Sequence, residues 1–466
     1  MNTRKFALIL ILCLNLLFVG GRLLVRTAPG HSYASAQSGQ SERVIMICVD
    51  GMVPDYYTAP EKLGLQVPNL TMMKNGGAYA DGVESVYPTV TFPAHTTLVT
   101  GVRPAVHGIV QNRIFEAPTE LQTRAWYWNA RDLKTETLWT VAKKAGLVTA
   151  AAHWPVTIGA DITYNVAEIY DYKESPATWK EMEKNATPGL LESALGSDKG
   201  AGLPTDEKLT RISEYVIRSY KPNLMLIHLI ELDGVHHRNG PRTKEAIDQA
   251  QREDAYIGRI VEATKKAGTF DGTTFFIVSD HGFASISKGF AANVVLAKEG
   301  LITVDPSGKA VAWKAAAWPA GGSAAIMVKD PNDKETEKKV TEIFSKIAKE
   351  AGSPIKQVLR RSDLKKLGAI PQATLMLEAA PGFTFNEFHT GEVVRPSGET
   401  YKGTHGYLPT NNEMRASLII YGLRAKKGGH ASLTRMIDTA PTIAELLKLK
   451  LPQAEGKPLK ELVTLP

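Results

Sequence analysis

Acidic and imidazole side chains recur next to several short apolar runs of the chain, and they are residue types that bind divalent metal ions. The candidates are Asp50 after residues 44–49, Asp233, His236 and His237 after residues 224–229, Asp280 and His281 after residues 274–278, and His405 before residues 417–421. Mixed oxygen and nitrogen ligands suit zinc best, with manganese or iron as alternatives. Three aspartates with three or four histidines exceed the needs of one tetrahedral ion but suit two ions about 3.5–4 Å apart, which can clamp the attacking and leaving oxygens of a displacement. These residue types therefore predict a two-metal hydrolytic site.

A threonine stands where a helix is expected to begin. Thr91 has Pro93 in the first predicted turn and Gly101 just past the predicted end, so its plain interpretation is an N-cap. The same position also suits a nucleophile, because a helix N-terminus stabilises an anion and receives a phosphate. A divalent cation bound near Asp50 would make the alkoxide accessible at neutral pH. Asn112 can donate its amide hydrogens to a non-bridging phosphate oxygen.

The apolar runs predict the sheet that must bring these residues together. They lie at residues 44–49, 148–152, 224–229, 274–278 and 417–421, and helix-like stretches separate them at residues 136–144, 206–220 and 246–266. Continuous apolar strands that alternate with helices indicate a doubly wound, mostly parallel α/β sheet covered on both faces. Ligands bind at the carboxyl ends of such strands. We therefore expect the candidate residues at one edge of the sheet, with Asp233 and His237 in a glycine-containing loop.

Residues 300–400 resemble an inserted, smaller α/β subdomain. They contain strand candidates at residues 324–328 and 373–377 and a charged, helix-like stretch at residues 333–350. The expected organisation is a signal peptide at 1–36, a linker at 37–42, the catalytic core at 43–299 and 401–466, and the insertion at 300–400 between the two core parts.

The N-terminus has the pattern of a secretory signal. Arg4 and Lys5 precede an apolar run at residues 6–20, and Ala34-Ser35-Ala36 offers a cleavage site. The run is shorter than a membrane-spanning helix needs, although an uncleaved anchor remains the alternative. We expect an exported protein, periplasmic or extracellular.

Composition excludes several classes of protein. The 466 residues are 43% hydrophobic and 22% charged, which is unlike a disordered, fibrous or multi-span membrane chain. The formal charge is +7, but four of the positive side chains (Arg4, Lys5, Arg22 and Arg26) lie in the first 36 residues, and without them the charge is +3. The chain is therefore not expected to bind a nucleic-acid polymer. Its two cysteines are Cys13 and Cys48, so the processed chain has no internal disulfide.

Five motifs occur in one order along the chain: Thr-Phe-Pro-x-His at 91–95, Thr-Gly-x-x-Pro-x-x-His-Gly-Ile at 100–109, Asp-x-x-x-His at 233–237, Asp-His-Gly-Phe at 280–283 and Gly-x-His-Gly-Tyr at 403–407. Together they resemble the nucleotide pyrophosphatase/phosphodiesterase family of the alkaline phosphatase superfamily, in a bacterial, exported form. The likeness extends from about residue 44 to residue 421 and is weakest at residues 290–400. It implies an alkaline phosphatase-like core.

The resemblance also implies roles for individual residues. Thr91 would be the nucleophile and Asn112 would assist it; one zinc would be held by Asp233, His237 and His405, and the other by Asp50, Asp280, His281 and the deprotonated Thr91. The register of the third motif selects His237 rather than His236 as a ligand. The implied mechanism is a two-step displacement through a phospho-threonine, which a water then hydrolyses, with net retention of configuration at phosphorus.

Residues 148–172 bear on the choice between diesters and monoesters. Monoesterase relatives place a Lys/Arg pair there, whereas this chain has no Lys or Arg in that stretch and reads His153-Trp154-Pro155, which is similar to the diesterase pattern. A diester needs a slot for its second substituent, and the candidate substrate-binding residues are Phe92, Asn112, Leu138, Trp154 and His228. For Phe92, Leu138 and Trp154, packing in the core is the plain alternative. His228 stands where many nucleotide-cleaving relatives have a base-stacking Tyr.

Other classes fit less well. A sulfatase requires a Cys/Ser-x-Pro-x-Arg motif at the nucleophile, which is missing here. Expected export argues against a phosphomutase, and a non-catalytic binding protein need not keep the whole ligand set. An alkaline phosphatase-type monoesterase and a phosphonate hydrolase stay open, and Arg113 is a candidate for the extra charge of a monoester. The expected partner is a small phosphodiester or nucleotide, with membrane contact only through a retained N-terminus.

Overall fold

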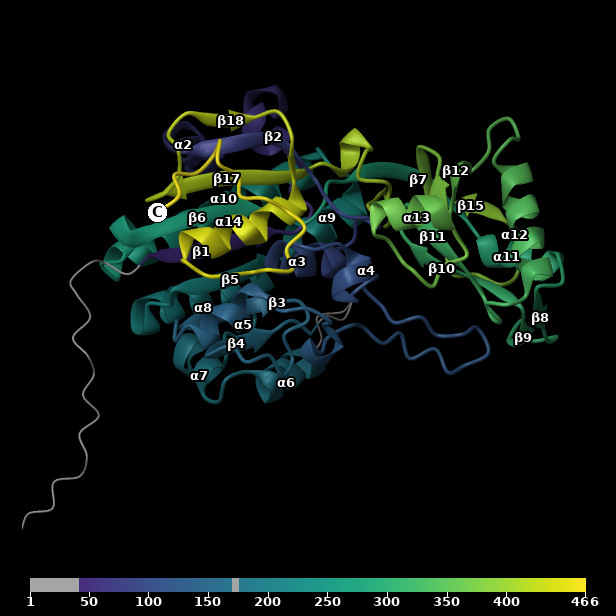
Figure 1. Cartoon of the computed structure of the whole chain (residues 1–466), viewed down its shortest axis with the longest axis horizontal. Coiled ribbons are helices and arrows are strands. Elements are labelled where there is room, and N and C mark those ends of the chain that lie inside the picture. The colour runs from purple at the N-terminus through teal and green to yellow at the C-terminus, as the bar shows by residue number, and fades with distance from the viewer. Residues whose placement is uncertain (1–41, 170–175) are drawn as a thin grey trace, which may run out of the picture. The chain divides into compact units, whose positions relative to one another are not determined.

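A nine-stranded sheet is the largest sheet of this computed structural model, which describes residues 42–169 and 176–466 (Figure 1). Its order is β18-β2-β17-β6-β1-β5-β3-β4, with β19 beside β2. The strands are β1 (Arg43–Val49), β2 (Ala78–Glu84), β3 (Thr149–Trp154), β4 (Tyr164–Ala167), β5 (Leu224–Leu229), β6 (Thr273–Val278), β17 (Ala416–Gly422), β18 (Gly429–Ala431) and β19 (Thr434–Arg435). The five central strands from β6 to β4 are mutually parallel, which confirms the predicted fold class. The apolar run at 417–421 differs, because β17 is antiparallel to both β2 and β6.

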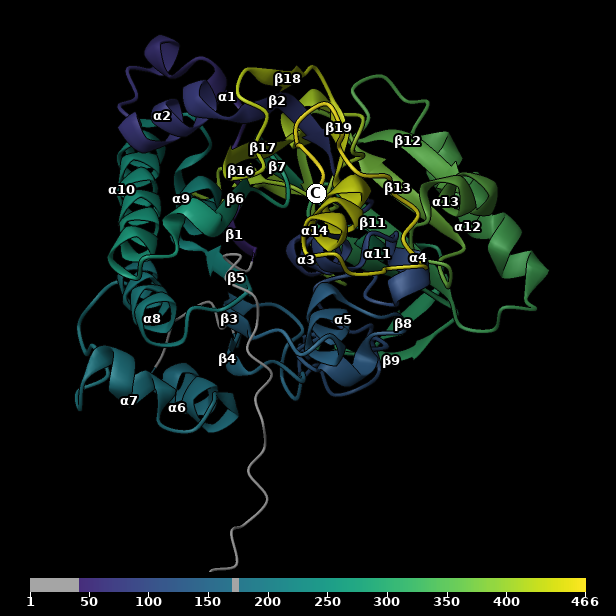
Figure 2. The ribbon, with the colours of Figure 1, turned by 60° about the vertical axis from the view of Figure 1, so that its left-hand side comes forward.

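Apolar side chains cover both faces of this sheet. In β1, Ile45 and Ile47 belong to one core cluster, whereas Met46 and Cys48 belong to the cluster on the other face. This alternation explains why the strand is apolar throughout. Figure 2 shows α2, α8 and α10 on one side of the sheet and α3, α5 and α14 on the other.

The helices occupy the connections between strands. They are α1 (Asp55–Thr58), α2 (Pro68–Gly76), α3 (Thr91–Thr100), α4 (Pro104–His107), α5 (Leu138–Lys144), α6 (Pro176–Asn185), α7 (Leu190–Leu195), α8 (Thr205–Tyr220), α9 (Glu231–Asn239), α10 (Lys244–Lys266), α11 (Ala292–Lys298), α12 (Lys334–Ile347), α13 (Arg361–Leu367) and α14 (Thr439–Leu446). Of these, α9 corrects the expectation of a loop around Asp233. A helix still places Asp233 and His237 on one face, because residues four apart are neighbours on its surface.

The inserted region forms an antiparallel sheet with the order β10-β11-β13-β12. Its strands are β10 (Ala315–Ala320), β11 (Ser323–Val328), β12 (Ile355–Arg360) and β13 (Leu375–Ala379). α11 and α12 pack on one face, and α13 packs on the other. Since α11 starts at Ala292, the secondary structure of this region begins before the predicted boundary at residue 300. The core and the inserted region together belong to one compact unit.

Short strands link the inserted region to the large sheet. β7 (Ala284–Phe290) follows β6 and pairs with β14 (Gly382–Phe385), β15 (Val394–Pro396) and β16 (Gly403–Thr404), while β8 (Ile302–Val304) pairs with β9 (Ala310–Trp313). β16 is the element that returns the chain to the edge of the large sheet, where His405 follows it directly.

The predicted signal peptide and residues 37–41 of the predicted linker lie outside the described residues. Within residues 42–169 and 176–466, no helix combines the length and the apolar character needed to cross a bilayer.

Candidate active site

The carboxyl ends of β1, β5 and β6 bring most of the predicted metal ligands together. Asp50 follows β1, Asp280 and His281 follow β6, and the helix after β5 carries Asp233. β5 and β6 lie on either side of β1. The edge of the sheet that the sequence singled out therefore gathers these side chains.

Asp50, Asp280 and His281 form the first group. The Nε2 atom of His281 lies 3.4 Å from Oδ1 of Asp50 and 3.1 Å from Oδ2 of Asp280. The other oxygen of Asp280 accepts hydrogen bonds from the backbone N–H groups of Gly51 and His281, each 3.0 Å long. Gly51 is required here, because its φ is +67° and an added Cβ would lie 3.0 Å from the ring of Phe283.

Asp233, His237 and His405 form the second group. Asp233 Oδ2 lies 3.4 Å from Nε2 of His237, and its Oδ1 lies 3.7 Å from Nε2 of His405. The ring of His405 stacks on the ring of His281, with centroids 3.6 Å apart, so the two groups are directly adjacent. Asp233, His281 and His405 also form a cluster that could hold a metal ion, which places His281 between the two groups. His236, by contrast, is hydrogen-bonded to Tyr56 at 2.8 Å.

The tautomers of three histidines leave their Nε2 lone pairs facing carboxylates. Nδ1 of His237 bonds the carbonyl of Gly403 at 2.9 Å, Nδ1 of His281 bonds that of Gly282 at 3.1 Å, and Nδ1 of His405 bonds that of Thr89 at 2.9 Å. A carbonyl only accepts, so Nδ1 carries the hydrogen in a neutral ring and Nε2 has none. A lone pair that faces a carboxylate oxygen is unfavourable unless a proton or a cation lies between them.

Several oxygens and nitrogens of the two groups are buried without a hydrogen-bond partner. They are Asp50 Oδ1, Asp233 Oδ1, Asp280 Oδ2 and His281 Nε2. Buried polar atoms are nearly always hydrogen-bonded, so an orphaned set of this kind needs an explanation. Carboxylate oxygens and imidazole nitrogens are the atoms that zinc binds. The residues present therefore fit a pair of divalent cations.

Burial dominates the electrostatics of these groups. It raises the pKa of Asp50 well above its usual value, and the neighbouring Asp280 raises it further. Burial also raises the pKa of Asp233 to about 6 and lowers the pKa of His281 and of His405 well below the usual range. Without a cation the site favours protonated carboxyls and neutral imidazoles, and neutral imidazole is the form that binds metal.

Thr91 is the first residue of α3, and Val90 occupies the N-cap position without a side-chain capping bond. The simple N-cap interpretation of Thr91 is therefore wrong by one position. Gly101 ends the helix with a left-handed φ of 70°, as predicted. Asn112 accepts the backbone N–H of Phe92 at 2.8 Å through Oδ1. This bond fixes the Asn112 amide beside the start of α3 and leaves its NH₂ end as a donor.

A pocket of about 480 Å³ opens beside Thr91. Asp50, Thr91 and Asp233 line it together with residues from α9 and α10. Two arginines, Arg238 and Arg252, also line the pocket, and both are exposed. The pocket therefore combines the predicted nucleophile, one ligand of each metal group and two cationic side chains.

Three predicted substrate-binding side chains lie in the core. Phe92, Leu138 and Trp154 have no exposed surface. Phe92 packs edge-on against Trp126, and Leu138 and Trp154 belong to the cluster between the sheet and α3. Without an accessible face they cannot wall a substrate slot, so this prediction is corrected in favour of core packing. Their apolar character suits either role, and the sequence alone did not separate the two.

His228, which was predicted to contact the substrate, is also buried away from any surface. Its ring is completely buried, with Nε2 3.1 Å from Oδ2 of Asp50 and Nδ1 2.9 Å from Oε2 of Glu168. His228 thus contacts a predicted metal ligand rather than open space.

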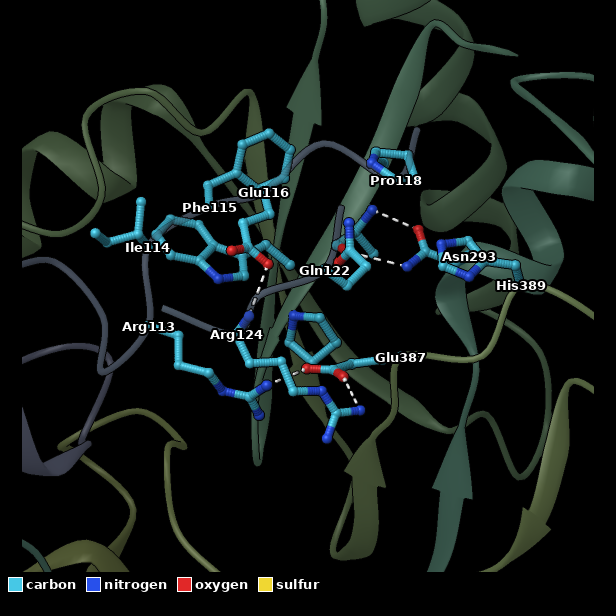
Figure 3. A pocket seen from close by; sticks show the side chains of 14 residues that line it. Arg113, Ile114, Phe115, Glu116, Pro118, Gln122, Arg124, Asn293, Glu387 and His389 are labelled. Atoms are coloured by element: carbon cyan, nitrogen blue, oxygen red, sulfur yellow. Dashed lines mark hydrogen bonds and ion pairs between the residues drawn. The ribbon is translucent and has the colours of Figure 1, made fainter. Parts of the chain in front are cut away.

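Arg113 lies in a pocket other than the one beside Thr91. Figure 3 shows Arg113 and Arg124 both turned toward Glu387 in a separate small pocket beside β10. The Arg113–Glu387 ion pair is 3.0 Å long and the Arg124–Glu387 pair is 3.4 Å long. Arg113 is therefore engaged in an ion pair with Glu387 and is not directed at the Thr91 pocket.

Sequence reasoning missed a second layer of polar residues. His95 is fully buried, and its Nδ1 bonds the carbonyl of Thr91 at 2.9 Å. Its ring lies 4.1 Å from the ring of His228. Glu168, three per cent exposed, bonds His228 from the end of β4. The position of Glu168 directly after β4, the short strand Tyr164–Ala167, is what gives it this place, and the polar Asn165 in that strand left no clear apolar run to signal it.

Comparisons with known proteins identify similar sequences. The family model described as "Type I phosphodiesterase / nucleotide pyrophosphatase" matches residues 44–408. The human ectonucleotide pyrophosphatase/phosphodiesterase family member 1 is 28% identical over 244 residues, which are 51% of this chain and 23% of that protein. The venom phosphodiesterase of Macrovipera lebetinus is 24% identical over 267 residues, 55% of this chain and 27% of its own. The match thus spans about a quarter of the length of these curated relatives.

Solved structures share the fold. An inactive variant of murine ectonucleotide pyrophosphatase / phosphodiesterase 5, in complex with AMP, superposes with a TM-score of 0.65 at 17% identity. The human protein of the same name gives a TM-score of 0.65 at 19% identity. Each alignment covers 91% of this chain and 100% of the other. At this identity the likeness establishes the architecture.

Proposed function

Because the chain belongs to the type I phosphodiesterase / nucleotide pyrophosphatase family, we propose that it is an exported, zinc-dependent hydrolase of phosphodiester or pyrophosphate bonds that works through a phospho-threonine at Thr91. The observation that carries the proposal is the pair of adjacent ligand groups, with Asp50 and Asp233 lining the same pocket as Thr91.

Two zinc ions fit the donor set. Asp233, His237 and His405 would hold one ion, and Asp50, Asp280 and His281 would hold the other, with Thr91 as a further ligand when deprotonated. When bound, the two ions supply positive charge that favours the Thr91 alkoxide and stabilises the charge on phosphorus and the leaving oxygen. Manganese or iron are the alternatives for this ligand set.

The residues of the chain then perform two displacements. Thr91 Oγ1 attacks phosphorus, the new Thr91–phosphorus bond forms, and the bond to the leaving group breaks. The NH₂ group of Asn112 and the amides at the start of α3 donate to the non-bridging oxygens. A water then attacks the phospho-threonine from the opposite side, which releases the second product and restores the Thr91 hydroxyl. Two inversions give net retention at phosphorus.

The proposed substrate is a small diester or a pyrophosphate. The strand-end segment of residues 148–169 carries no Lys or Arg, and Arg113 is engaged with Glu387. The name and the bound AMP of the structural relative support a nucleotide as one substrate class. The monoesterase alternative keeps one observation in its favour, because Arg238 and Arg252 line the pocket and can neutralise an additional charge.

Export is part of the proposal. Arg4, Lys5 and the apolar run at residues 6–20 support a secretory signal. The similarity to proteins named venom phosphodiesterase also supports export, because venom is secreted. The physiological compartment would be the periplasm or the extracellular space.

Comparing two aryl esters tests the substrate assignment. We expect kcat/KM for a bis-aryl phosphate to exceed that for the mono-aryl phosphate of the same phenol by at least tenfold, since a monoester carries an extra negative charge that a diesterase does not neutralise. The Thr91→Ala variant is the control for contaminating activity. The reverse ranking would reassign the protein to the monoesterases. If the protein hydrolysed none of three substrates, the two esters and a dinucleoside pyrophosphate, the proposal that it is a hydrolase would be refuted.

A further inference from the structure

Three ionisable side chains lie together next to Asp50, at the ends of three neighbouring strands. His153 lies in β3, Glu168 follows β4 and His228 lies in β5. One ligand atom of each lies within 4.8 Å of the others. The exposed fractions are 2%, 3% and 0%, respectively. None of the three belongs to the two ligand groups described above.

The two ring nitrogens of His228 face more hydrogen-bond acceptors than a neutral imidazole has N–H groups. Its Nε2 faces Oδ2 of Asp50 at 3.1 Å. Its Nδ1 faces Oε2 of Glu168 at 2.9 Å and the carbonyl oxygen of His153 at 3.2 Å. A neutral imidazole has a single N–H. Either tautomer therefore leaves one lone pair facing a carboxylate oxygen. With the hydrogen on Nε2, which then donates to Asp50, the lone pair of Nδ1 faces the Glu168 carboxylate and the His153 carbonyl, and a cation among these three acceptors would satisfy them all.

His153 supplies an unpartnered ligand to the same place. Its Nδ1 is buried and has no hydrogen-bond partner. The residue also has a φ of +61°, a left-handed conformation that is uncommon outside glycine and that clusters at functional sites. The ring of His153 lies nearly parallel to that of His228, with centroids 5.9 Å apart. A buried imidazole held in a strained conformation without a partner needs a ligand to account for it.

The cluster has a route to solvent. Glu168 and Asp50 both line the pocket of about 480 Å³ beside Thr91. An ion can therefore reach Glu168 from this pocket, and a water can complete its coordination from the same side.

We propose that His153, Glu168 and His228 bind a third divalent cation, separate from the two of the proposed catalytic pair. Two imidazoles and one carboxylate are a ligand set that zinc uses in three-ligand sites with one open position. The ion at this third site would hold His228 in the tautomer whose Nε2–H donates to Asp50. That hydrogen bond would in turn fix the orientation of the Asp50 carboxylate.

Counting bound zinc in four forms of the full chain tests the third site. Each metal-free protein is dialysed against buffered zinc, and the ions per chain are measured by mass spectrometry of the metal. We expect three ions in the wild type and two in both His153→Ala and Glu168→Gln. Glu253→Gln is the matched control, because Glu253 is equally buried and belongs to a separate acidic cluster with Asp206 and Glu231. This control is expected to keep three ions.

The difference between wild type and the two cluster variants decides the inference. An equal count in wild type, His153→Ala and Glu168→Gln would overturn it, since a pure hydrogen-bond network retains the same ions. Loss of an ion in Glu253→Gln alone would assign the additional ion to the acidic cluster. If the proposed catalytic pair were wrong, the wild type would instead hold one ion and the two variants none, so the two proposals fail separately. Circular dichroism of each variant establishes that it is folded, and His153→Ala, which leaves the Glu168–His228 bond in place, decides the outcome if Glu168→Gln unfolds.

Discussion

At the scale of single residues, the site depends on which atom of each side chain is left without a partner. The three Nδ1 atoms of His237, His281 and His405 all donate to backbone carbonyls. The backbone thus selects the tautomer before any metal binds, and the free Nε2 atoms converge on Asp50, Asp233 and Asp280. The sequence predicted these six residues as ligands but carried no information on the carbonyls that orient them.

Asn112 offers a test at this scale. Its Oδ1 accepts the N–H of Phe92, so only its NH₂ end is available to the phosphate. We predict that Asn112→Ala lowers kcat about 100-fold with a small change in KM, as expected for a donor that acts in the transition state. Steady-state kinetics with a bis-aryl phosphate measures this effect.

Asn112→Asp is the informative control, because aspartate keeps the acceptor for Phe92 but has no N–H group. A loss as large as that of the alanine variant supports the donor role. Wild-type kcat in Asn112→Asp would instead assign Asn112 to holding the start of α3.

The roles of several residues lay beyond sequence reasoning for a physical reason. Asp50 and His281 follow continuous apolar runs and Thr91 stands at an expected helix start, so their places in the fold were predictable. Phe92 and Trp154 were not assigned correctly, because an aromatic side chain is equally suited to a core and to a substrate slot, and only burial distinguishes them. Glu168 was missed because its importance depends on His228, which is sixty residues away in sequence.

At the scale of elements, the strand ends and helix starts position the chemistry. The continuous apolar run of β1 predicted a strand buried on both faces, and apolar core clusters cover both faces of the sheet. The direction of β17 was not predictable from its apolar run, since parallel and antiparallel strands share that pattern when both faces are covered. The helix α9 was not predictable either, because Gly234 favours a loop in the sequence. In the structure α9 packs against α10.

Glu378 joins the inserted sheet to the site and gives a prediction at this scale. Its Oε1 accepts the N–H of Leu408, three residues after His405, and Tyr87 donates to its Oε2. Burial raises the pKa of Glu378 from 4.5 to about 8. Between these pH values the folded state binds the proton and the unfolded chain does not, so stability falls as pH rises from 4.5 to 8.

We therefore predict that Glu378→Gln, which stays neutral, loses less stability than the wild type over this range. The expected gain in Tm of the variant relative to the wild type is about 5 °C at pH 8 and close to zero at pH 4.5. Thermal unfolding at a series of pH values measures it. Parallel Tm curves for the two proteins would show that Glu378 does not carry the titration.

At the scale of the whole molecule, the two ligand groups draw on widely separated segments. β1 contributes near residue 50, α9 near residue 233, β6 near residue 280, and the return strand β16 near residue 404 (Figure 2). A pair of ions bound by all four segments would hold these separate parts of the chain together. Binding to the folded state alone stabilises it by about 2.7 kcal/mol per site at a free concentration 100 times Kd.

Removal of the metal should accordingly destabilise the folded chain. We predict that a chelator abolishes activity and lowers Tm by at least about 5 °C, and that added zinc restores both. Differential scanning calorimetry with and without chelator measures the shift. The variant Asp280→Asn is the control and is expected to respond less, because one ligand group is already impaired; an unchanged Tm and full activity in the chelated wild type would contradict the two-ion site.

The most direct test of the account is to trap the covalent intermediate on Thr91. A bis-aryl phosphate is mixed with the enzyme, the reaction is stopped with acid within milliseconds, and the digested protein is analysed by mass spectrometry. The account predicts that the peptide containing Thr91 gains the mass of an aryl phosphoryl group, and that Thr91→Ala shows neither this peptide nor more than a thousandth of the wild-type turnover. An aryl phosphoryl group on another residue, or a Thr91→Ala activity within tenfold of the wild type, would contradict it.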